Sequence, residues 1–167
     1  EAINLLACDE VVIKPFISAS ARSTYRIKKS EWLSYETIFK DCVENEAMMI
    51  QEFQKSIPEK GEVSLMFFGK SYSHAVLKKA KKGDFRVQDD FDGTVHDYIA
   101  SEEELAFAQQ VIAQIEPLPC YSRVDIFRDN DGQLALGELE LIEPELWFRN
   151  HEEAADLLAD EFLKLRH

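Results

Sequence analysis

The sequence has few of the features that mark several common protein classes. It has three cysteines, Cys8, Cys42 and Cys120, an odd number at spacings of 34 and 78 residues. Neither a disulfide framework nor a zinc site follows from that pattern, and we expect reduced thiols. We find no apolar run long enough for a transmembrane helix, no signal peptide, no low-complexity tract and no internal repeat. We therefore expect a cytoplasmic protein without a membrane partner.

Basic residues are also scarce. Lys and Arg number 19 against 32 Asp and Glu, which gives a formal charge of −13 and an isoelectric point near 4.7. This balance argues against an extended nucleic-acid surface but allows a local basic phosphate pocket. With 167 residues, 46% of them hydrophobic, the chain suits one domain or two small lobes. It starts without a Met, inside what reads as a structured element, and we expect a piece of a longer protein.

The most informative stretch covers residues 123–145. Two apolar-rich runs flank the dipeptide Asp131-Gly132, a pattern that predicts a β-hairpin, usually with a two-residue type I′ turn. If this dipeptide is the loop, counting outward sets Asp125 directly opposite Glu138. Because side chains alternate along a strand, Asp125, Glu138 and Glu140 then project from one face.

Three carboxylates on one face need a counter-charge. Directly opposed residues have Cβ atoms about 4.5–5.5 Å apart, where like charges destabilise the pair. The second strand is also apolar on both faces, with Leu134 and Leu136 on the acidic side and Leu139 and Leu141 on the other. Buried carboxylates need a partner or a shifted pKa. Mg²⁺ is one such partner, since it is commonly held by one or two carboxylates plus substrate phosphates.

Two other interpretations of these acids stay open. One is a solvated acidic strand in which Arg123, opposite Glu140 in the same register, neutralises that carboxylate. The other is an EF-hand calcium loop that ends at Glu138, although Phe127 then takes the first position, where Asp belongs. The flanking segments read as strands, whereas an EF-hand requires helices.

Basic residues gather in one patch, residues 78–86 (KKAKKGDFR). The patch is either a solvated loop or a site that captures phosphate or carboxylate, with Arg86 suited to a bidentate contact. Near the start of the chain, residues 11–13 predict a strand that delivers Lys14 to a loop of small residues. A plain hairpin with an exposed lysine is the alternative there.

The remaining elements follow from apolar periodicity. Residues 24–27, 48–53, 62–68 and 71–79 predict strands, the last two joined by a tight turn. Helices are predicted to begin at Ser30, at the capping box Ser101–Glu104 and at Asn150. The predicted core face of the first helix consists of Trp32, Tyr35, Phe39, Cys42 and Val43. That of the last helix consists of Ala154, Leu157, Leu158, Phe162 and Leu165. The order is roughly β-β-α-β-β-β-α-β-β-α, which indicates an α+β fold with two lobes.

In order and spacing, these motifs resemble the nucleotide-binding part of an ATP-grasp ligase, similar to the branch of glutathione synthetase and the ribosomal-protein glutamate ligase. The resemblance covers nearly the whole chain. Residues 11–15 resemble the family's VVKP strand, 18–27 its phosphate loop and FRV strand, 50–53 its VQEF hinge, 78–86 its KR…GEFR segment, 123–125 its GVD, and 138–140 its E-x-N metal motif.

The resemblance implies an α+β fold of the ATP-grasp type, in which two α/β lobes with antiparallel sheets hold ATP between them. Residues 1–54 would form the small lobe, with the phosphate loop and hinge. Residues 55–167 would form the large C-terminal lobe, with the metal and phosphate site. An N-terminal substrate domain of the same protein is missing from this sequence, and a homo-oligomer is compatible with the family.

The resemblance also implies roles for individual residues. Arg86 would stabilise charge on the transferring phosphoryl group, and Arg123 and Glu143 are assigned to the substrate. Asp125, Glu138 and Glu140 would coordinate Mg²⁺, or Mn²⁺ in its place. The ATP-binding residues would be Lys14, Ser18, Ala19, Ser20, Gln51, Glu52, Phe53, Gln54, Glu62 and Lys78, of which Glu62 would bind the ribose hydroxyls.

The implied activity is ATP-dependent ligation of a small-molecule carboxylate to an amine through an acyl phosphate, with release of ADP and phosphate. Some positions depart from the family pattern: the phosphate loop (SASARST) lacks glycines, Glu140 replaces the usual Asn, and Glu143-Pro144 replaces a small-residue segment. In these respects the chain is similar to the cycloserine-forming cyclo-ligase subgroup. The alternative function is a non-catalytic module that binds nucleotide or a divalent metal.

Overall fold

A computed structural model describes residues 6–17, 22–81 and 93–164. The chain divides into two compact units, Glu1–Gln54 and Lys55–His167. Each unit has its own sheet, and we describe them separately. Their identification as the small and large lobes of a nucleotide-binding enzyme stays a prediction.

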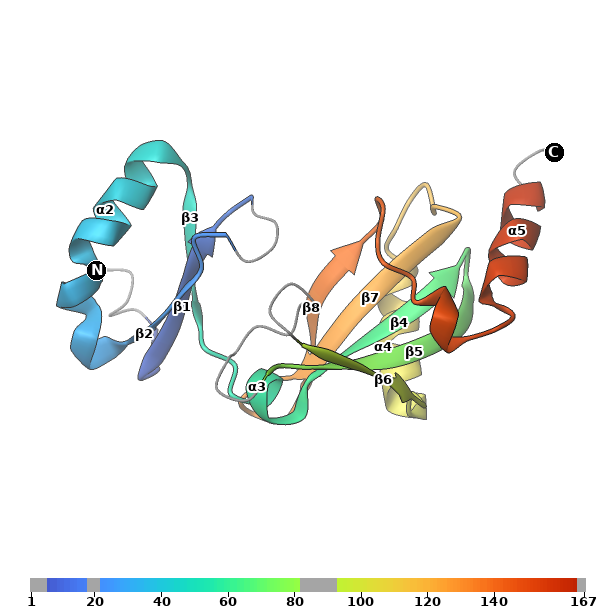
Figure 1. The fold of residues 1–167 in the computed structure, drawn as a ribbon, viewed down its shortest axis with the longest axis horizontal. Coiled ribbons are helices and arrows are strands. Elements are labelled where there is room, and N and C mark those ends of the chain that lie inside the picture. Colours follow the sequence, from blue (N-terminus) through green and yellow to red (C-terminus); the bar gives the residue numbers. More distant parts are fainter. Residues whose placement is uncertain (1–5, 18–21, 82–92, 165–167) are drawn as a thin grey trace. The chain divides into compact units, whose positions relative to one another are not determined.

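The first unit is a three-stranded antiparallel sheet with a helical layer (Figure 1). Its centre is β1, which pairs with β2 on one side and β3 on the other. Val11, Ile13 and Ile27 form its buried core. Its elements are β1 (Glu10–Pro15), β2 (Tyr25–Lys28), the 3₁₀ helix η1 (Lys29–Tyr35), α2 (Glu36–Asn45) and β3 (Met48–Glu52).

The predicted core face of the first helix is correct only in part. Tyr35 and Phe39 pack against the core, but Trp32 and Val43 are each 44% exposed. The segment also begins as a 3₁₀ turn rather than as an α-helix. A three-stranded sheet offers a narrow face, so it covers the middle of the apolar stripe and leaves the edges in solvent.

The second unit is built on a five-stranded antiparallel sheet in the order β6-β5-β4-β7-β8. The predicted strands 62–68 and 71–79 are confirmed, whereas β6 and the short α3 are absent from the predicted order. The α+β prediction is confirmed. The elements are α3 (Ser56–Lys60), β4 (Glu62–Phe68), β5 (Ser71–Lys79), β6 (Thr94–Tyr98), α4 (Glu102–Ile112), β7 (Tyr121–Arg128), β8 (Leu134–Glu140), η3 (Phe148–Asn150) and α5 (Ala154–Lys164).

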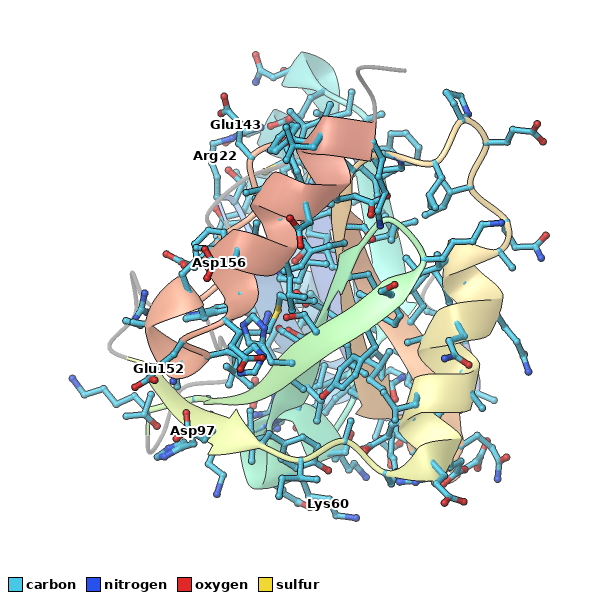
Figure 2. The ribbon with its side chains drawn as sticks, turned by 90° about the vertical axis from the view of Figure 1, so that its right-hand side faces the viewer. Arg22, Lys60, Asp97, Glu143, Glu152 and Asp156 are labelled. Carbon is cyan, nitrogen blue, oxygen red and sulfur yellow. The ribbon has the colours of Figure 1, made fainter. Side chains whose placement is uncertain are left out.

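The two faces of this sheet carry different helices, as Figure 2 shows for α4 and α5. Leu65 and Phe67 of β4 pack on the side of α4, and Met66 and Phe68 pack on the side of α5. Because side chains alternate, Ser64 points to the same face as Met66. This second face is apolar near α5 and becomes polar along the strands, and the polar end carries the candidate site.

The two predicted helix caps have different outcomes. At α4 the capping box is confirmed: the Ser101 backbone N–H donates to Glu104 Oε2 at 2.8 Å, and the Glu104 backbone N–H donates to Ser101 Oγ. At α5 the predicted cap is wrong. Asn150 belongs to η3 and donates its amide to Asp97 Oδ1 of β6 at 2.8 Å, because the chain makes an additional turn before α5 starts. Figure 2 labels Asp97 on that strand.

None of the helices in the described residues is long and apolar enough to cross a membrane.

Candidate metal centre

The hairpin β7–β8 carries the three acids, and its turn differs from the prediction. The Asp129 backbone N–H donates to the Gln133 carbonyl at 2.8 Å, and the Gly132 N–H donates to the Asp129 carbonyl at 3.0 Å. The loop therefore has three residues instead of two. Gly132 lies at its end with φ of +83°, a conformation that glycine adopts without steric cost.

A second irregularity restores the predicted register. Near the turn, Ile126 pairs with Leu136, one residue away from the predicted pairing. The ladder then shifts between Asp125 and Ile126, where Gly137 is the extra residue on β8. As a result Asp125 lies opposite Glu138, as predicted. The longer loop and the bulge offset each other.

The bulge also changes which side chains share a face. Leu134 was predicted on the acidic face, but it packs against the same core as Leu139, and Leu136 is 42% exposed. An extra residue inverts the alternation between the turn and the bulge. A Cβ on Gly137 would lie 2.5 Å from Glu62 Oε1, so glycine at this position lets β8 approach Glu62.

Asp125, Glu138 and Glu140 converge. One carboxylate oxygen from each lies within 4.8 Å of the other two. Asp125 is fully buried, the Glu140 side chain is about one-third exposed and the Glu138 side chain is more than half exposed. The cluster is therefore buried at Asp125 and open to solvent at Glu138.

Two cations lie among these acids. Arg123 donates from Nε to Asp125 Oδ1 and from Nη2 to Asp125 Oδ2, each at 2.9 Å, and also donates from Nη2 to Glu140 Oε1. Lys78 contacts Asp125 Oδ2 at 2.8 Å and Glu62 Oε2 at 2.7 Å. The interpretation of Lys78 as part of a solvated loop is therefore wrong, because it lies in β5 with a buried side chain.

The charges of this network do not cancel. The four carboxylates of Glu62, Asp125, Glu138 and Glu140 against Lys78 and Arg123 (six residues in all) leave a formal charge of −2 when every group is ionised. Every contact in the network involves at least one charged group with little exposure, where solvent screens charge weakly. The surplus matches the charge of one divalent cation.

The pKa shifts show where the surplus lies. Burial raises the pKa of Glu138 above 4.5, and the charges of Asp125 and Glu140 raise it further. Burial also acts to raise the pKa of Asp125, but Lys78 and Arg123 outweigh it, so that this pKa lies below 3.8. Burial raises the pKa of Glu62 above 4.5 despite Lys78. Glu138 is the most exposed of these carboxylates, so a cation from solvent could reach it and offset the charges of Asp125 and Glu140.

The donor set fits a hard divalent ion such as Mg²⁺, which prefers carboxylate oxygens. The Ser64 hydroxyl adds a second observation. Ser64 pairs directly with Asp125 across β4 and β7, and its Oγ is buried with no hydrogen-bond partner among residues 6–17, 22–81 and 93–164. A buried hydroxyl without a partner is uncommon and calls for a group that the protein itself does not supply.

The structure brings Glu62, Lys78 and Arg123 together with the three acids, and among the described residues Glu143 has no ion pair with this network. Glu143 is exposed in the segment after β8 and has φ of +54° (labelled in Figure 2). Glu62 is buried against Lys78, so its assignment to ribose stays a prediction. Ser18, Ala19, Ser20 and Arg86 lie outside the described residues.

The predicted nucleotide residues of the first unit lie on two neighbouring strands and their ends. Lys14 is half-buried near the end of β1 and pairs with Met49, while Gln51 and Glu52 end β3. Phe53 is buried, with the Arg26 guanidinium 3.8 Å from its ring centroid. Gln54 follows it. Their contacts with a nucleotide stay predictions.

Sequence reasoning missed three contributors to the centre: the buried pairing of Lys78, the Ser64 hydroxyl and the Trp147 ring. Lys78 shares the face of His74 and Val76 in β5, but only the order β5-β4-β7 brings that face to Asp125. A strand order of this kind is not readable from one sequence. The Arg123 guanidinium lies 5.1 Å from the Trp147 ring centroid, a contact between a strand and a distant loop.

Comparison with known proteins gives a consistent group. No protein-family profile matches the chain. Over 153 residues, or 82% of its length, the chain is 29% identical to the cycloserine biosynthesis protein DcsG of Streptomyces lavendulae and spans 48% of that protein. The chain therefore spans about half the length of the curated relative it matches.

Solved structures agree with that match. The crystal structure of the D-cycloserine synthetase DcsG is similar over 98% of this chain and 57% of that one, with a TM-score of 0.77 and 25% identity. D-alanine–D-alanine ligase from Bacillus anthracis matches 99% of this chain and 58% of its own, with a TM-score of 0.69 and 17% identity. The ATP-grasp ligase PsnB, solved with a precursor variant, Mg and ADP, matches 92% of this chain and 46% of its own, with a TM-score of 0.62 and 14% identity.

Proposed function

The chain has the ATP-grasp fold of these ligases, and we propose that it is the ATP-binding part of a ligase that joins a carboxylate to an amine. ATP would phosphorylate the carboxylate, and the amine would then displace phosphate from the acyl phosphate. The proposal includes small-molecule substrates and a further substrate domain of the same protein. It also includes a cytoplasmic location and assembly as a homo-oligomer.

One observation carries the proposal. Three carboxylates, of which Asp125 is fully buried, converge, and the six-residue ionic network to which they belong has a formal surplus of two negative charges. ATP itself carries negative charge, so a cluster of acids can meet its phosphates only with a metal in between. Bound Mg²⁺, or Mn²⁺, would supply the positive charge that lets phosphates approach Asp125, Glu138 and Glu140. Catalysis of phosphoryl transfer is chiefly positioning and charge stabilisation, which this arrangement suits.

The protein's own residues would contribute in distinct ways. Lys78 fixes the carboxylate of Asp125 through a contact of 2.8 Å and keeps it ionised. Glu138, which is the most exposed of the three acids, gives the site its entrance. From the first unit, Lys14 would contact phosphates, and the strand end at Gln51 and Glu52 would meet the adenine. Arg86, from residues 55–167, would stabilise the transferring phosphoryl group.

The names of the similar proteins point to different products, so the substrate has to be identified by experiment. The full-length protein is supplied with ATP, MgCl₂ and a panel of amino acids and hydroxyamino acids, alone and in pairs, and ADP is measured. We expect magnesium-dependent ADP release that needs both a carboxylate and an amine, whether on two molecules or on one. Glu138→Gln should abolish it, whereas Asp131→Asn, an exposed change in the hairpin loop, should not.

The second candidate is a module that binds nucleotide or a divalent metal without catalysis. The glycine-poor phosphate loop, SASARST, favours it, since glycine lets backbone N–H groups approach phosphates most closely. Saturable binding of Mg·ATP with no ADP release above background for any pair would support this module and contradict the ligase.

A further inference from the structure

Arg123 occupies the place that a metal ion would need. Its Nη2 contacts oxygens of all three acids: Asp125 Oδ2 at 2.9 Å, Glu140 Oε1 in a short ion pair, and Glu138 Oε2 at 3.7 Å. These are the three carboxylates whose oxygens converge. The Arg123 guanidinium is therefore the counter-charge that all three acids of the cluster share.

The lone pairs of Asp125 show the conflict most directly. A carboxylate oxygen has two lone pairs. Asp125 Oδ2 accepts from Lys78 Nζ at 2.8 Å and from Arg123 Nη2 at 2.9 Å, and Oδ1 accepts from Arg123 Nε at 2.9 Å. Both lone pairs of Oδ2 are therefore taken, while Oδ1 keeps one, so a metal that binds through Oδ2 must displace a donor.

Lys78 is the donor that stays. Its Nζ lies 2.7 Å from Glu62 Oε2 as well as 2.8 Å from Asp125 Oδ2, so its departure would leave the buried carboxylate of Glu62 without its cation. Arg123 has an alternative on its other side. Its Nη1 donates to the Glu145 carbonyl at 3.4 Å, and its guanidinium lies 5.1 Å from the ring centroid of Trp147.

Trp147 itself is an unusual residue. Its backbone has φ of +45°, which a bulky residue rarely adopts, and the residue as a whole is 3% exposed. Its indole N–H is buried without a hydrogen-bond partner in the described part of the chain. Its backbone N–H donates to Glu145 Oε1 at 2.7 Å, which binds it to the segment that follows β8. A backbone conformation of this kind persists only where the surrounding structure holds the residue in it.

We propose that Arg123 is a positioning residue that leaves the carboxylates when a divalent cation binds, and that Trp147 and segment 143–147 move with it. This inference rests on the metal site of the proposed function. It couples occupancy of the metal site to the segment immediately after β8, through one guanidinium that contacts both. An Arg is suited to this, because its planar group can pair with carboxylates on its edge and lie against a ring on its face.

The test uses two readouts that do not depend on turnover. The 167 residues contain two tryptophans, so Trp32→Phe leaves Trp147 as the only indole among them, and any tryptophan outside this sequence is replaced by Phe as well. In that background, emission is followed as MgCl₂ replaces choline chloride at constant ionic strength. Mn²⁺ affinity is measured separately from the electron paramagnetic resonance signal of the free ion. Variants are Arg123→Met and Arg123→Lys.

The matched control is Arg128→Met, which removes the same charge from the same strand, at an arginine paired with exposed Glu103. We expect Arg123→Met to bind Mn²⁺ at least tenfold more tightly than the parent protein, and Arg128→Met less than twofold more tightly. Magnesium should shift Trp147 emission in the parent. The shift should be lost in Arg123→Met and reduced in Arg123→Lys, which keeps the charge but not the planar group.

Three results would overturn the inference. The first is Trp147 emission that stays unchanged at saturating Mg²⁺ in the parent protein. Arg123 is not substituted in that measurement, so a misfolded variant cannot obscure the answer. The second is equal Mn²⁺ affinity in the Arg123→Met and Arg128→Met variants, because the Arg123 guanidinium then does not compete with the metal for the carboxylates. Absence of Mn²⁺ binding in every variant, including the parent, overturns the metal assignment of the proposed function as well.

Discussion

Replacing Lys78 by Met removes the one cation that joins two buried carboxylates. Lys78 lies 2.7 Å from Glu62 and 2.8 Å from Asp125, and all three side chains are nearly inaccessible to solvent. Asp125 keeps Arg123 after the substitution, so Glu62 is the group that loses its partner. Removal of one member of a buried ion pair typically costs about 3–5 kcal/mol.

Protonation of Glu62 limits that cost. Its ordinary pKa is 4.5, and burial already raises it. Keeping the carboxyl neutral at pH 7 costs about 1.4 kcal/mol per pH unit above this value, or about 3.4 kcal/mol. For a protein of this size that corresponds to a fall in Tm of about 7–14 °C. At pH 5 the same reasoning leaves less than about 1 kcal/mol.

The pH dependence identifies the cause. In the Lys78→Met variant, Glu62 has a folded pKa well above its unfolded value, so the folded state binds the extra proton. Below pH 4.5 the Lys78→Met variant is therefore as stable as the parent protein. It loses stability relative to the parent as pH rises through the folded pKa of Glu62. Urea denaturation of both proteins from pH 5 to pH 8 measures this slope.

The adjacent lysine supplies the control. Lys79 is exposed in the same strand, and Lys79→Met should change the free energy of unfolding by less than about 0.5 kcal/mol. Adding Glu62→Gln to Lys78→Met should recover stability at pH 7 and remove the slope. The reasoning is refuted if Lys78→Met costs no more than Lys79→Met, or if its cost is the same at pH 5 and pH 8.

Three further predictions concern stability alone. Ser64→Ala should raise the free energy of unfolding by about 1 kcal/mol, because it removes a buried hydroxyl without a partner in the described residues, and a lower Tm would contradict this. Ser101→Ala should lower it by about 1 kcal/mol through loss of the α4 capping box, whereas Ser30→Ala, at an exposed serine, should lower it much less; equal costs in denaturation would argue against the cap. Burial lowers the pKa of His74 below 6.5, so the stability it contributes is present above pH 6.5 and lost as pH falls through the folded pKa; His74→Gln should flatten the denaturation profile there, and an unchanged profile would contradict this.

Local patterns in the sequence predict much of the second unit. Strands 62–68 and 71–79 follow from their apolar runs and the Gly69-Lys70 turn, and the α4 cap follows from Ser101 and Glu104. These features depend on neighbours a few residues apart. They are therefore visible without knowledge of the fold.

The register of the site was predicted correctly through two errors that offset each other. The loop has one residue more than the Asp-Gly pattern predicts, and the bulge at Gly137 adds one residue to β8. The bulge lies where β8 comes against Glu62 of another strand, a tertiary contact that local sequence does not reveal. The sequence contains the glycine but not the reason for it.

Long-range order is the part that the sequence does not provide. Lys78 looked like one member of a basic loop because its neighbours, Lys79 and Lys81, are also basic. Its partners Glu62 and Asp125 lie 16 and 47 residues away and meet it through the strand order β5-β4-β7. The opposite error occurred at Trp32, where an apolar stripe predicted burial that a narrow sheet cannot supply.

The most direct test of the metal site is a calorimetric titration of the full-length protein with Mg·ATP, for the parent protein, Glu138→Gln and Asp131→Asn. Glu138 has more than half of its side chain exposed, so its neutral isostere should fold normally. The proposed site predicts a Kd at least tenfold higher for Glu138→Gln and unchanged for Asp131→Asn. Equal affinity in all three proteins would contradict it.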